Sequence, residues 1–274
     1  MLELRTSVRP GAGSGRDLAS LREQVRRLEC GAGAGRTLSF GVAALDAALP
    51  GGGLALGALH EVMGAGPDEE DGAVAAAFAA GILARLARTE GTPILWCLGA
   101  DDLYAPALAA YGLAPERLLL ARCRSDEDIL WAMEEGLRGA VLAAVIGEVG
   151  VLTPTAGRRL QLACEAAGTS GFVLRRWRSG TAAARQRGVP SVAATRWRIA
   201  AAPSRGEGEP HSTPLGIGAP LWRVELLRCR GGLPRLWLME EGDATGHVAL
   251  AAELADRPVV PGRQPGLVAV RRAG

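Results

Sequence analysis

The 274-residue sequence predicts an α/β protein with a mainly parallel sheet flanked by helices, followed by a late set of antiparallel strands. From residue 38 onward, short apolar runs alternate with longer segments that could form crossover helices. The short runs are apolar at nearly every position, which is typical of strands covered by helices on both faces. A glycine-rich loop joins the first of these runs to the first long helical segment.

Each expected element follows from this alternation. The candidate parallel strands are residues 58–63, 93–98, 118–123, 141–146 and 171–174. The segments long enough for crossover helices are residues 72–88, 103–111, 127–137 and 155–167. Three late strands are expected at residues 193–202, 221–230 and 235–240, with a hairpin turn at Gly231-Gly232. The tryptophans of these late strands, Trp197, Trp222 and Trp237, are expected in the core.

The chain divides into three parts. Residues 1–36 hold an amphipathic helix between glycine-rich linkers. One face of that helix presents Leu18, Leu21, Val25 and Leu28. These four side chains are candidate contacts for a partner, and packing on the protein's own body is the alternative.

The other two parts are the core and the C-terminal end. Residues 37–246 form the core, in which residues 203–220, rich in proline, glycine and serine, are expected to be a mobile insertion. Residues 247–274 are expected to hold a strand remnant and a tail with prolines and arginines.

Composition narrows the classes of function. A net charge of +2 is too small for the whole surface to attract nucleic acid, so any such binding needs local clusters of arginine. Five cysteines without a C-x-x-C pair predict reduced core thiols, and three scattered histidines predict no metal site. The N-terminus lacks a secretory layout, and the apolar run at residues 73–84 is too short to cross a bilayer. We therefore expect a cytoplasmic protein without membrane contact.

The glycine-rich loop has the outline of a phosphate-binding loop without its chemistry. Glycines keep the backbone nest, but an alanine stands at the lysine position and a valine at the hydroxyl position. No lysine occurs anywhere in the chain. The degenerate loop consists of Gly64, Gly66, Pro67, Gly72, Ala73 and Val74.

Residues 68–71 add four acids to this loop, where a triphosphate would lie. Repulsion and the missing cation predict that the protein uses no cofactor, with weak ATP binding as the alternative. The acids are expected to turn outward and stabilise the following helix through its positive end. A docking site for an arginine-rich partner is the other interpretation of the same residues.

The order of elements resembles the RecA-type recombinase core, and several motifs resemble the bacterial ImuA family. The segments at residues 40–54 and 152–154 are similar to those around the RecA phosphate loop and Walker B strand. The motifs similar to ImuA proteins are residues 103–108 with 111–113, 158–163 with 165–166, 195–198, 222–228 and 230–232. Together they span residues 38–246.

The resemblance bears on the metal and catalytic positions. The resemblance implies that Gly147 stands where a Walker B aspartate would be, and that Glu148 lies one residue after that position. Strand alternation would turn the Glu148 side chain to the opposite face. Asp101 and Asp102 lie near the position of the acid that activates water, although capping of a helix is an alternative role. No catalytic residue is assigned.

Arginines after the last parallel strand occupy a position where RecA-like proteins have a mobile DNA-binding loop. Neutralisation of phosphates by arginine, with an aromatic ring stacked on a base, is typical of single-strand binding. The candidate DNA contacts are Arg175, Arg176, Trp177, Arg178, Arg185 and Arg187, with Arg158 and Arg159 on the preceding helix. A solvated loop that binds nothing specific is the alternative.

The resemblance implies a role in DNA-damage-induced (SOS) mutagenesis and translesion DNA synthesis. The implied partners are an ImuB-like Y-family polymerase homologue, an error-prone C-family DNA polymerase and RecA, with single-stranded DNA. Because the nucleotide loop is degenerate, we expect a nonhydrolytic adaptor that bridges DNA and these proteins. The alternatives are a DNA-stimulated ATPase or recombinase with an unconventional nucleotide site, and a regulatory inhibitor on the same core.

Overall fold

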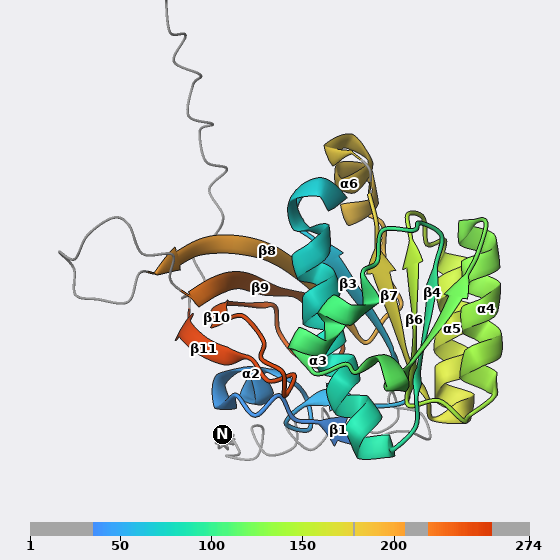
Figure 1. Ribbon diagram of the computed structural model, residues 1–274, viewed down its shortest axis with the longest axis horizontal. Coiled ribbons are helices and arrows are strands. Elements are labelled where there is room, and N and C mark those ends of the chain that lie inside the picture. Colours follow the sequence, from blue (N-terminus) through green and yellow to red (C-terminus); the bar gives the residue numbers. More distant parts are fainter. Residues whose placement is uncertain (1–34, 178, 206–218, 254–274) are drawn as a thin grey trace, which may run out of the picture.

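A computed structural model describes residues 35–177, 179–205 and 219–253 (Figure 1). Its centre is a nine-stranded sheet with the order β11-β10-β9-β8-β3-β7-β6-β4-β5. Six neighbouring strands are parallel: β3 (Leu59–Gly64), β4 (Ile94–Leu98), β5 (Leu118–Arg122), β6 (Ala144–Val149), β7 (Ser170–Arg175) and β8 (Thr195–Arg205). Three antiparallel strands complete the sheet: β9 (Ala219–Cys229), β10 (Arg235–Glu240) and β11 (Ala249–Glu253). The expected α/β architecture with late antiparallel strands is confirmed.

Helices cover both faces of the parallel strands, as Figure 1 shows. On one face lies α3 (Ala73–Glu90), whose side chains join an apolar cluster with β4, β6 and the late strands. On the other face α4 (Asp126–Arg138) and α5 (Pro154–Ala167) pack side by side in a second cluster. Each of these two helices begins at a hydroxyl cap, because Ser125 accepts from the Asp128 N–H and Thr153 from the Ala156 N–H.

Several short elements differ from the sequence expectation. The segment predicted as a crossover helix at residues 103–111 forms a 3₁₀-helix at Ala105–Tyr111, with a proline in its first turn. A helix, α6 (Gly180–Arg187), lies within the segment expected to be a loop. Before β3 the chain forms α2 (Ala43–Ala48) and a small antiparallel pair, β1 (Thr37–Leu38) with β2 (Leu54–Ala55).

An aromatic cluster joins the late strands to α3. Trp197, Trp222 and Trp237 are each at most 2% exposed, which confirms their predicted place in the core. The rings of Phe40 and Phe78 lie 5.8 Å and 5.6 Å from that of Trp197. Aromatic contacts at these separations add to the free energy gained by burial. The late strands are therefore held to the α3 side of the core.

The α3 helix and the turn before it are the one stretch of the described residues that is long and apolar enough to cross a membrane. Of its most apolar window, 78% is buried inside the protein. Core helices of water-soluble proteins have the same composition. We therefore assign its apolar residues to the core.

Three of the predicted segments lie partly or wholly outside the described residues. These are the amphipathic helix within residues 1–36, most of the insertion at 203–220, and the tail beyond residue 253. The first residues of the predicted insertion belong to β8 and its last residues to β9. The predicted strand remnant near the C-terminus is present as β11.

Candidate functional site

The degenerate loop lies at the carboxyl ends of the parallel strands, where ligands of open α/β sheets bind. It joins β3 to α3 through a five-residue π-helical turn at Asp68–Gly72. Three neighbouring strand ends bring further charged residues to this edge: Asp102 after β4, Glu148 in β6 and Arg176 after β7.

Four backbone N–H groups of this loop donate to carbonyl groups within the protein. The N–H groups of Glu70 and Asp71 both donate to the carbonyl of Pro67, at 3.0 Å and 3.1 Å. Those of Ala65 and Asp68 donate to the carbonyls of Ile199 and Trp177, both at 2.9 Å. A loop that binds phosphate needs such donors free to point at the ligand. Here they hold β8 and the chain after β7 against the loop.

The Asp71 carboxylate takes the place of an anion in the loop. Its Oδ2 accepts from the Gly66 N–H at 2.7 Å, and its Oδ1 accepts from the Ala201 N–H at 3.1 Å. Asp71 is buried, together with the following Gly72. A Cβ on Gly66 would lie 2.5 Å from Glu70 Oε2 and 3.2 Å from Asp71 Oδ2. The glycine therefore gives room to the chain's own acids.

A single guanidinium, that of Arg176, binds three acids from three different elements. Its Nε and Nη1 donate to Asp68 Oδ2 and Glu148 Oε2, each at 3.0 Å. Its Nη2 donates to Asp102 Oδ2 at 2.5 Å. Arginine can do this because its planar group carries five donors in a fixed arrangement. The Arg176 side chain thus places a positive charge among the carboxylates of the loop, β6 and the β4 end.

The orientation predicted for Glu148 is wrong. Its side chain points to the same edge as the loop, where Oε1 accepts from the Trp96 indole N–H at 2.8 Å and Oε2 binds Arg176. The residue that faces the opposite side is Gly147, where a Cβ would lie 2.2 Å from Met133 Sδ of α4. Alternation along β6 was correctly expected, but the face assigned to each residue was reversed.

Burial and neighbouring charges shift the pKa values of both Glu148 and Arg176. Burial raises the pKa of the Glu148 carboxyl, while Arg176 and the Trp96 N–H lower it in part. For Arg176, burial by itself would lower the pKa, but Glu148, Asp68 and Asp102 together raise it. The guanidinium is therefore a permanent positive charge that stabilises the ionised form of Glu148.

The four acids of the loop do not act together as predicted. Glu69 and Glu70 are exposed, whereas Asp68 binds Arg176 and Asp71 binds the backbone. The N-cap residues of the π-helical turn and of α3 are Pro67 and Gly72, and neither makes a side-chain cap hydrogen bond. The expectation that all four turn outward is wrong for Asp68 and Asp71, because the π-helical turn directs these two side chains into the protein.

The two acids after β4 also have structural partners. Asp101 pairs with Arg122 at 2.6 Å, and both side chains are mostly exposed. Asp102 pairs with Arg176. Neither caps the 3₁₀-helix that follows, whose N-cap residue Tyr104 makes no side-chain cap bond. The capping interpretation is therefore wrong for both.

Burial removes two residues from the predicted DNA-binding set. Arg175 and Trp177 are each 2% exposed. The Arg175 Nη2 and the Trp177 indole N–H both donate to the carbonyl of Gly150, at 2.9 Å and 3.1 Å. Stacking of Trp177 on a base would require the loss of this packing. Arg176 is occupied by the three acids already described.

The remaining candidates differ in accessibility. Arg158 and Arg185 are exposed, and Arg159 pairs with Glu134 at 2.5 Å. Arg178 and the side chain of Arg187 lie outside the described residues, as do the partner candidates Leu18, Leu21, Val25 and Leu28. The structure thus leaves Arg158 and Arg185 as described arginines available to a polyanion.

A second buried ion cluster was not foreseen from the sequence. Glu61 in β3 is 1% exposed, and its carboxylate lies 3.2 Å from Arg196 and 3.8 Å from Arg175. Ser191 donates a further hydrogen bond to it. The sequence signal is a glutamate inside a mostly apolar strand, and a glutamate that is buried there requires a cationic partner.

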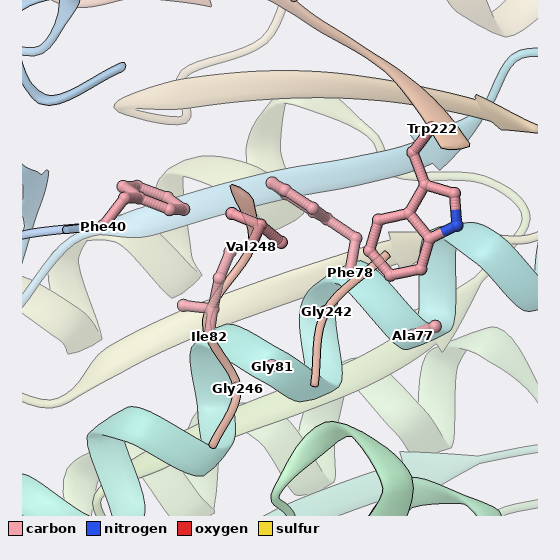
Figure 2. Close-up of a pocket in the computed structure, with 9 residues that line it drawn as sticks. All are labelled: Phe40, Ala77, Phe78, Gly81, Ile82, Trp222, Gly242, Gly246 and Val248. Atoms are coloured by element: carbon pink, nitrogen blue, oxygen red, sulfur yellow. The ribbon is translucent and has the colours of Figure 1, made fainter. Parts of the chain in front are cut away.

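Two hollows lie elsewhere in the described residues. Figure 2 shows Phe40, Phe78, Ile82, Trp222 and Val248 around a gap between α3 and the segment before β11. Its volume is about 10 Å³, room for roughly one water molecule. A hollow of about 210 Å³ lies at the opposite, amino end of the parallel strands. The described residues contain no cluster of three or more histidine, cysteine or acidic side chains arranged for a metal ion.

Comparison with known proteins identifies the family. The chain is 42% identical over 227 residues to Protein ImuA of Caulobacter vibrioides strain NA1000, covering 81% of this chain and 91% of that protein. The chain belongs to the ImuA family. Protein ImuA of Caulobacter vibrioides strain ATCC 19089 matches equally well. No family model matches the chain.

Membership of the ImuA family agrees with the motifs quoted from the sequence, and two of these motifs lie beside the degenerate loop. The ImuA-like segment that begins at Leu103 directly follows Asp102, which binds Arg176. The ImuA-like segment at residues 195–198 forms the start of β8, which is paired with β3. In this ImuA-family chain, two of the quoted motifs therefore lie beside the site described above.

Proposed function

We propose that this ImuA-family chain is a nonhydrolytic, RecA-like adaptor in DNA-damage-induced (SOS) mutagenesis and translesion DNA synthesis. It bridges single-stranded DNA and an ImuB-like Y-family polymerase homologue with an error-prone C-family polymerase, and RecA is a further partner. The observation that supports this proposal is the filled loop: Arg176 binds Asp68, Glu148 and Asp102, and Asp71 binds the Gly66 N–H.

The filled loop argues against catalysis on three counts. The cation of the site belongs to the chain, so a nucleotide would have to break its ion pairs. The backbone donors of Ala65, Gly66 and Asp68 are already bonded. The position that would hold the metal-binding aspartate faces α4 as Gly147, and Glu148 is bound to Arg176 and Trp96.

The same contacts join the loop, the β4 end, β6 and the chain after β7 through the protein's own side chains. An adaptor needs fixed surfaces more than turnover, since binding partners recognise shape and charge. The sheet order and the loop between the central β3 and α3 support a RecA-like core.

The proposed DNA contact rests on the accessible arginines. Arg158 at the start of α5 and Arg185 in α6 are exposed and follow neighbouring strands β6 and β7. Phosphate contacts of this kind are independent of sequence and depend on salt. Cytoplasmic location and the absence of membrane contact belong to the same proposal.

Reconstitution tests the adaptor role directly. The full chain is mixed with single-stranded DNA and a purified Y-family homologue, and ATP turnover and complex formation are measured together. We expect no DNA-stimulated hydrolysis and the same complex with or without Mg²⁺ and ATP. Hydrolysis stimulated by single-stranded DNA, or a complex that requires ATP, would contradict the proposal.

A further inference from the structure

The strand at one end of the nine-stranded sheet, β5, exposes apolar side chains on both of its faces. Within the described residues β5 pairs only with β4. Leu119 is 50% exposed and Leu120 is 45% exposed. Leu119 shares a face with Ala121, which packs against the apolar cluster beneath α4 and α5. Leu120 shares the other face with Leu118, which packs against the cluster that includes α3. A strand added beside β5 would therefore cover a leucine on each face.

Three common devices that keep a sheet edge from pairing are missing from β5. Its sequence, Leu-Leu-Leu-Ala-Arg, contains no proline and no charge before the last position. Its register with β4 runs from Leu118 to Arg122 without a bulge. Five residues is a common length for a strand. An apolar edge of this kind is a site where another strand can be added to the sheet.

The backbone of β5 presents hydrogen-bonding groups to this open side at regular spacing. The Cys123 N–H, just after the strand, donates to the Leu98 carbonyl of β4 at 2.8 Å. In a parallel pair every second residue of a strand bonds to the same neighbour, so residues 119 and 121 are the ones that face β4. The N–H and C=O groups of Leu118, Leu120 and Arg122 therefore point away from β4.

This spacing suits antiparallel pairing with an identical strand. A two-fold axis can place any residue of β5 opposite its own counterpart. Only the register centred on Leu120 pairs all of the outward-facing residues of the strand with one another, because Leu118 then lies opposite Arg122 of the second copy. In such directly opposed pairs the two residues exchange both N–H···O bonds. On the other face, Leu119 lies opposite Ala121 of the second copy.

The same register places opposite charges together at both ends of the paired segment. Glu116 and Arg124 are exposed and lie equally far along the chain from Leu120. Centring the pair on Leu120 therefore brings Glu116 of each copy opposite Arg124 of the other. Opposite charges across antiparallel strands stabilise the pairing, and like charges destabilise it. This charge complementarity of the strand with itself favours a second copy over an unrelated strand.

We propose that β5 pairs in antiparallel orientation with β5 of a second copy of this chain, with Leu120 opposite its own counterpart. The two copies then share one continuous sheet. The dimer is isologous, because both copies use the same surface. The pairing goes beyond the proposed adaptor role and does not depend on it. It brings two copies of any surface that binds DNA or a partner into one assembly.

Sedimentation equilibrium of the full-length chain measures this pairing. We expect the mass of the parent to approach twice 28.3 kDa as its concentration rises through the micromolar range. Leu120→Arg sets like charges against each other at the two-fold axis and should raise the dissociation constant of the dimer at least tenfold. The matched control is Leu233→Arg, because Leu233 is also exposed but lies between β9 and β10. We expect the control to dimerise like the parent.

A charge exchange tests the register. Glu116→Arg places two arginines near each other at each end of the pairing and should weaken the dimer several-fold. Glu116→Arg combined with Arg124→Glu restores opposite charges at both ends. We expect this double variant to recover the dissociation constant of the parent.

The other outcomes overturn the proposal. A parent chain that stays monomeric at high micromolar concentration would refute the dimer. A dimer that Leu120→Arg leaves unchanged, or that Leu233→Arg weakens equally, would assign the contact to another surface. A double charge variant that stays as weak as Glu116→Arg would refute the register centred on Leu120.

Discussion

The contribution of the Arg176 guanidinium can be measured by removing it. In Arg176→Ala, Glu148 keeps a carboxylate whose side chain is 3% exposed and loses its cationic partner. Only the Trp96 N–H still donates to it. Asp68 and Asp102 add negative charge nearby. The variant therefore leaves a buried charge without compensation.

The magnitude follows from how buried each pair is. Breaking a buried ion pair by removal of one partner costs about 3–5 kcal/mol. The Asp102 side chain is 51% exposed, so its pair with Arg176 contributes little. Because Arg176 itself is 21% exposed, we place the loss at the lower end, about 3 kcal/mol in the free energy of unfolding at pH 7.5. The Tm should fall by roughly 6–12 °C for a chain of this size.

The sign of the pH dependence is fixed by Glu148. Burial already raises its pKa, and loss of Arg176 raises this pKa further. The folded protein therefore binds the Glu148 proton more tightly than the unfolded chain does. This proton binding stabilises the fold fully below the ordinary carboxyl pKa, and the stabilisation is lost as pH rises through the raised pKa. The deficit of Arg176→Ala relative to the parent should shrink as pH falls toward 4.5.

Urea denaturation measures the free energy of unfolding of three proteins: the parent, the single variant Arg176→Ala, and the double variant that combines Arg176→Ala with Glu148→Gln. The double variant removes the stranded charge and should recover most of the lost stability, with no dependence on Glu148 titration. A loss below about 1 kcal/mol in Arg176→Ala, or no recovery in the double variant, would refute the account of Glu148 as a charge held by Arg176.

Three further predictions concern other parts of the protein. Burial lowers the pKa of His60 to about 4, so the unfolded chain binds its proton first and stability should fall by about 3 kcal/mol as pH drops from 6.5 to 4. In His60→Gln, urea titrations at several pH values should lack this decline; a parallel decline would contradict the assignment. Gly147→Ala should cost about 1–3 kcal/mol in chemical denaturation because its Cβ meets Met133, whereas Gly180→Ala, with nothing within 4 Å, should be nearly neutral. Arg185→Ala should reduce the slope of log K against log salt for single-stranded DNA by about 1, and an unchanged slope would exclude Arg185 as a phosphate contact.

The sheet could be predicted from the sequence because its signal is local. Strands β3, β4 and β6 are mostly apolar, and each lies within a few residues of its expected place. The degenerate loop could also be recognised, since it requires only the absence of a lysine and a hydroxyl at known spacing.

The occupant of the loop could not be predicted from the sequence. Arg176 binds Asp68 across 108 positions of the chain, and only the folded sheet brings the ends of β3 and β7 together. A basic run after a strand is typical of a nucleic-acid loop, so the pattern favoured a surface role for Arg175 and Trp177. Burial reversed that interpretation, because Glu61 and the Gly150 carbonyl are their partners.

The side of the sheet to which Glu148 points could not be predicted from the sequence either. Alternation predicts that Gly147 and Glu148 point to opposite sides, but it does not say which side holds the loop. That choice depends on Met133 and Ile129 of α4, which fill the space beside Gly147. The π-helical turn could not be predicted either, because its extra residue, which directs Asp71 into the loop, has no signal in the sequence.

The chain's own side chains fill the degenerate loop. Isothermal titration of Mg²⁺ and ATP into the full-length protein tests this most directly. We expect no saturable heat up to millimolar nucleotide, because the donors of the loop and the Arg176 guanidinium are already bonded. Saturable binding of one ATP per chain with a micromolar Kd would contradict it.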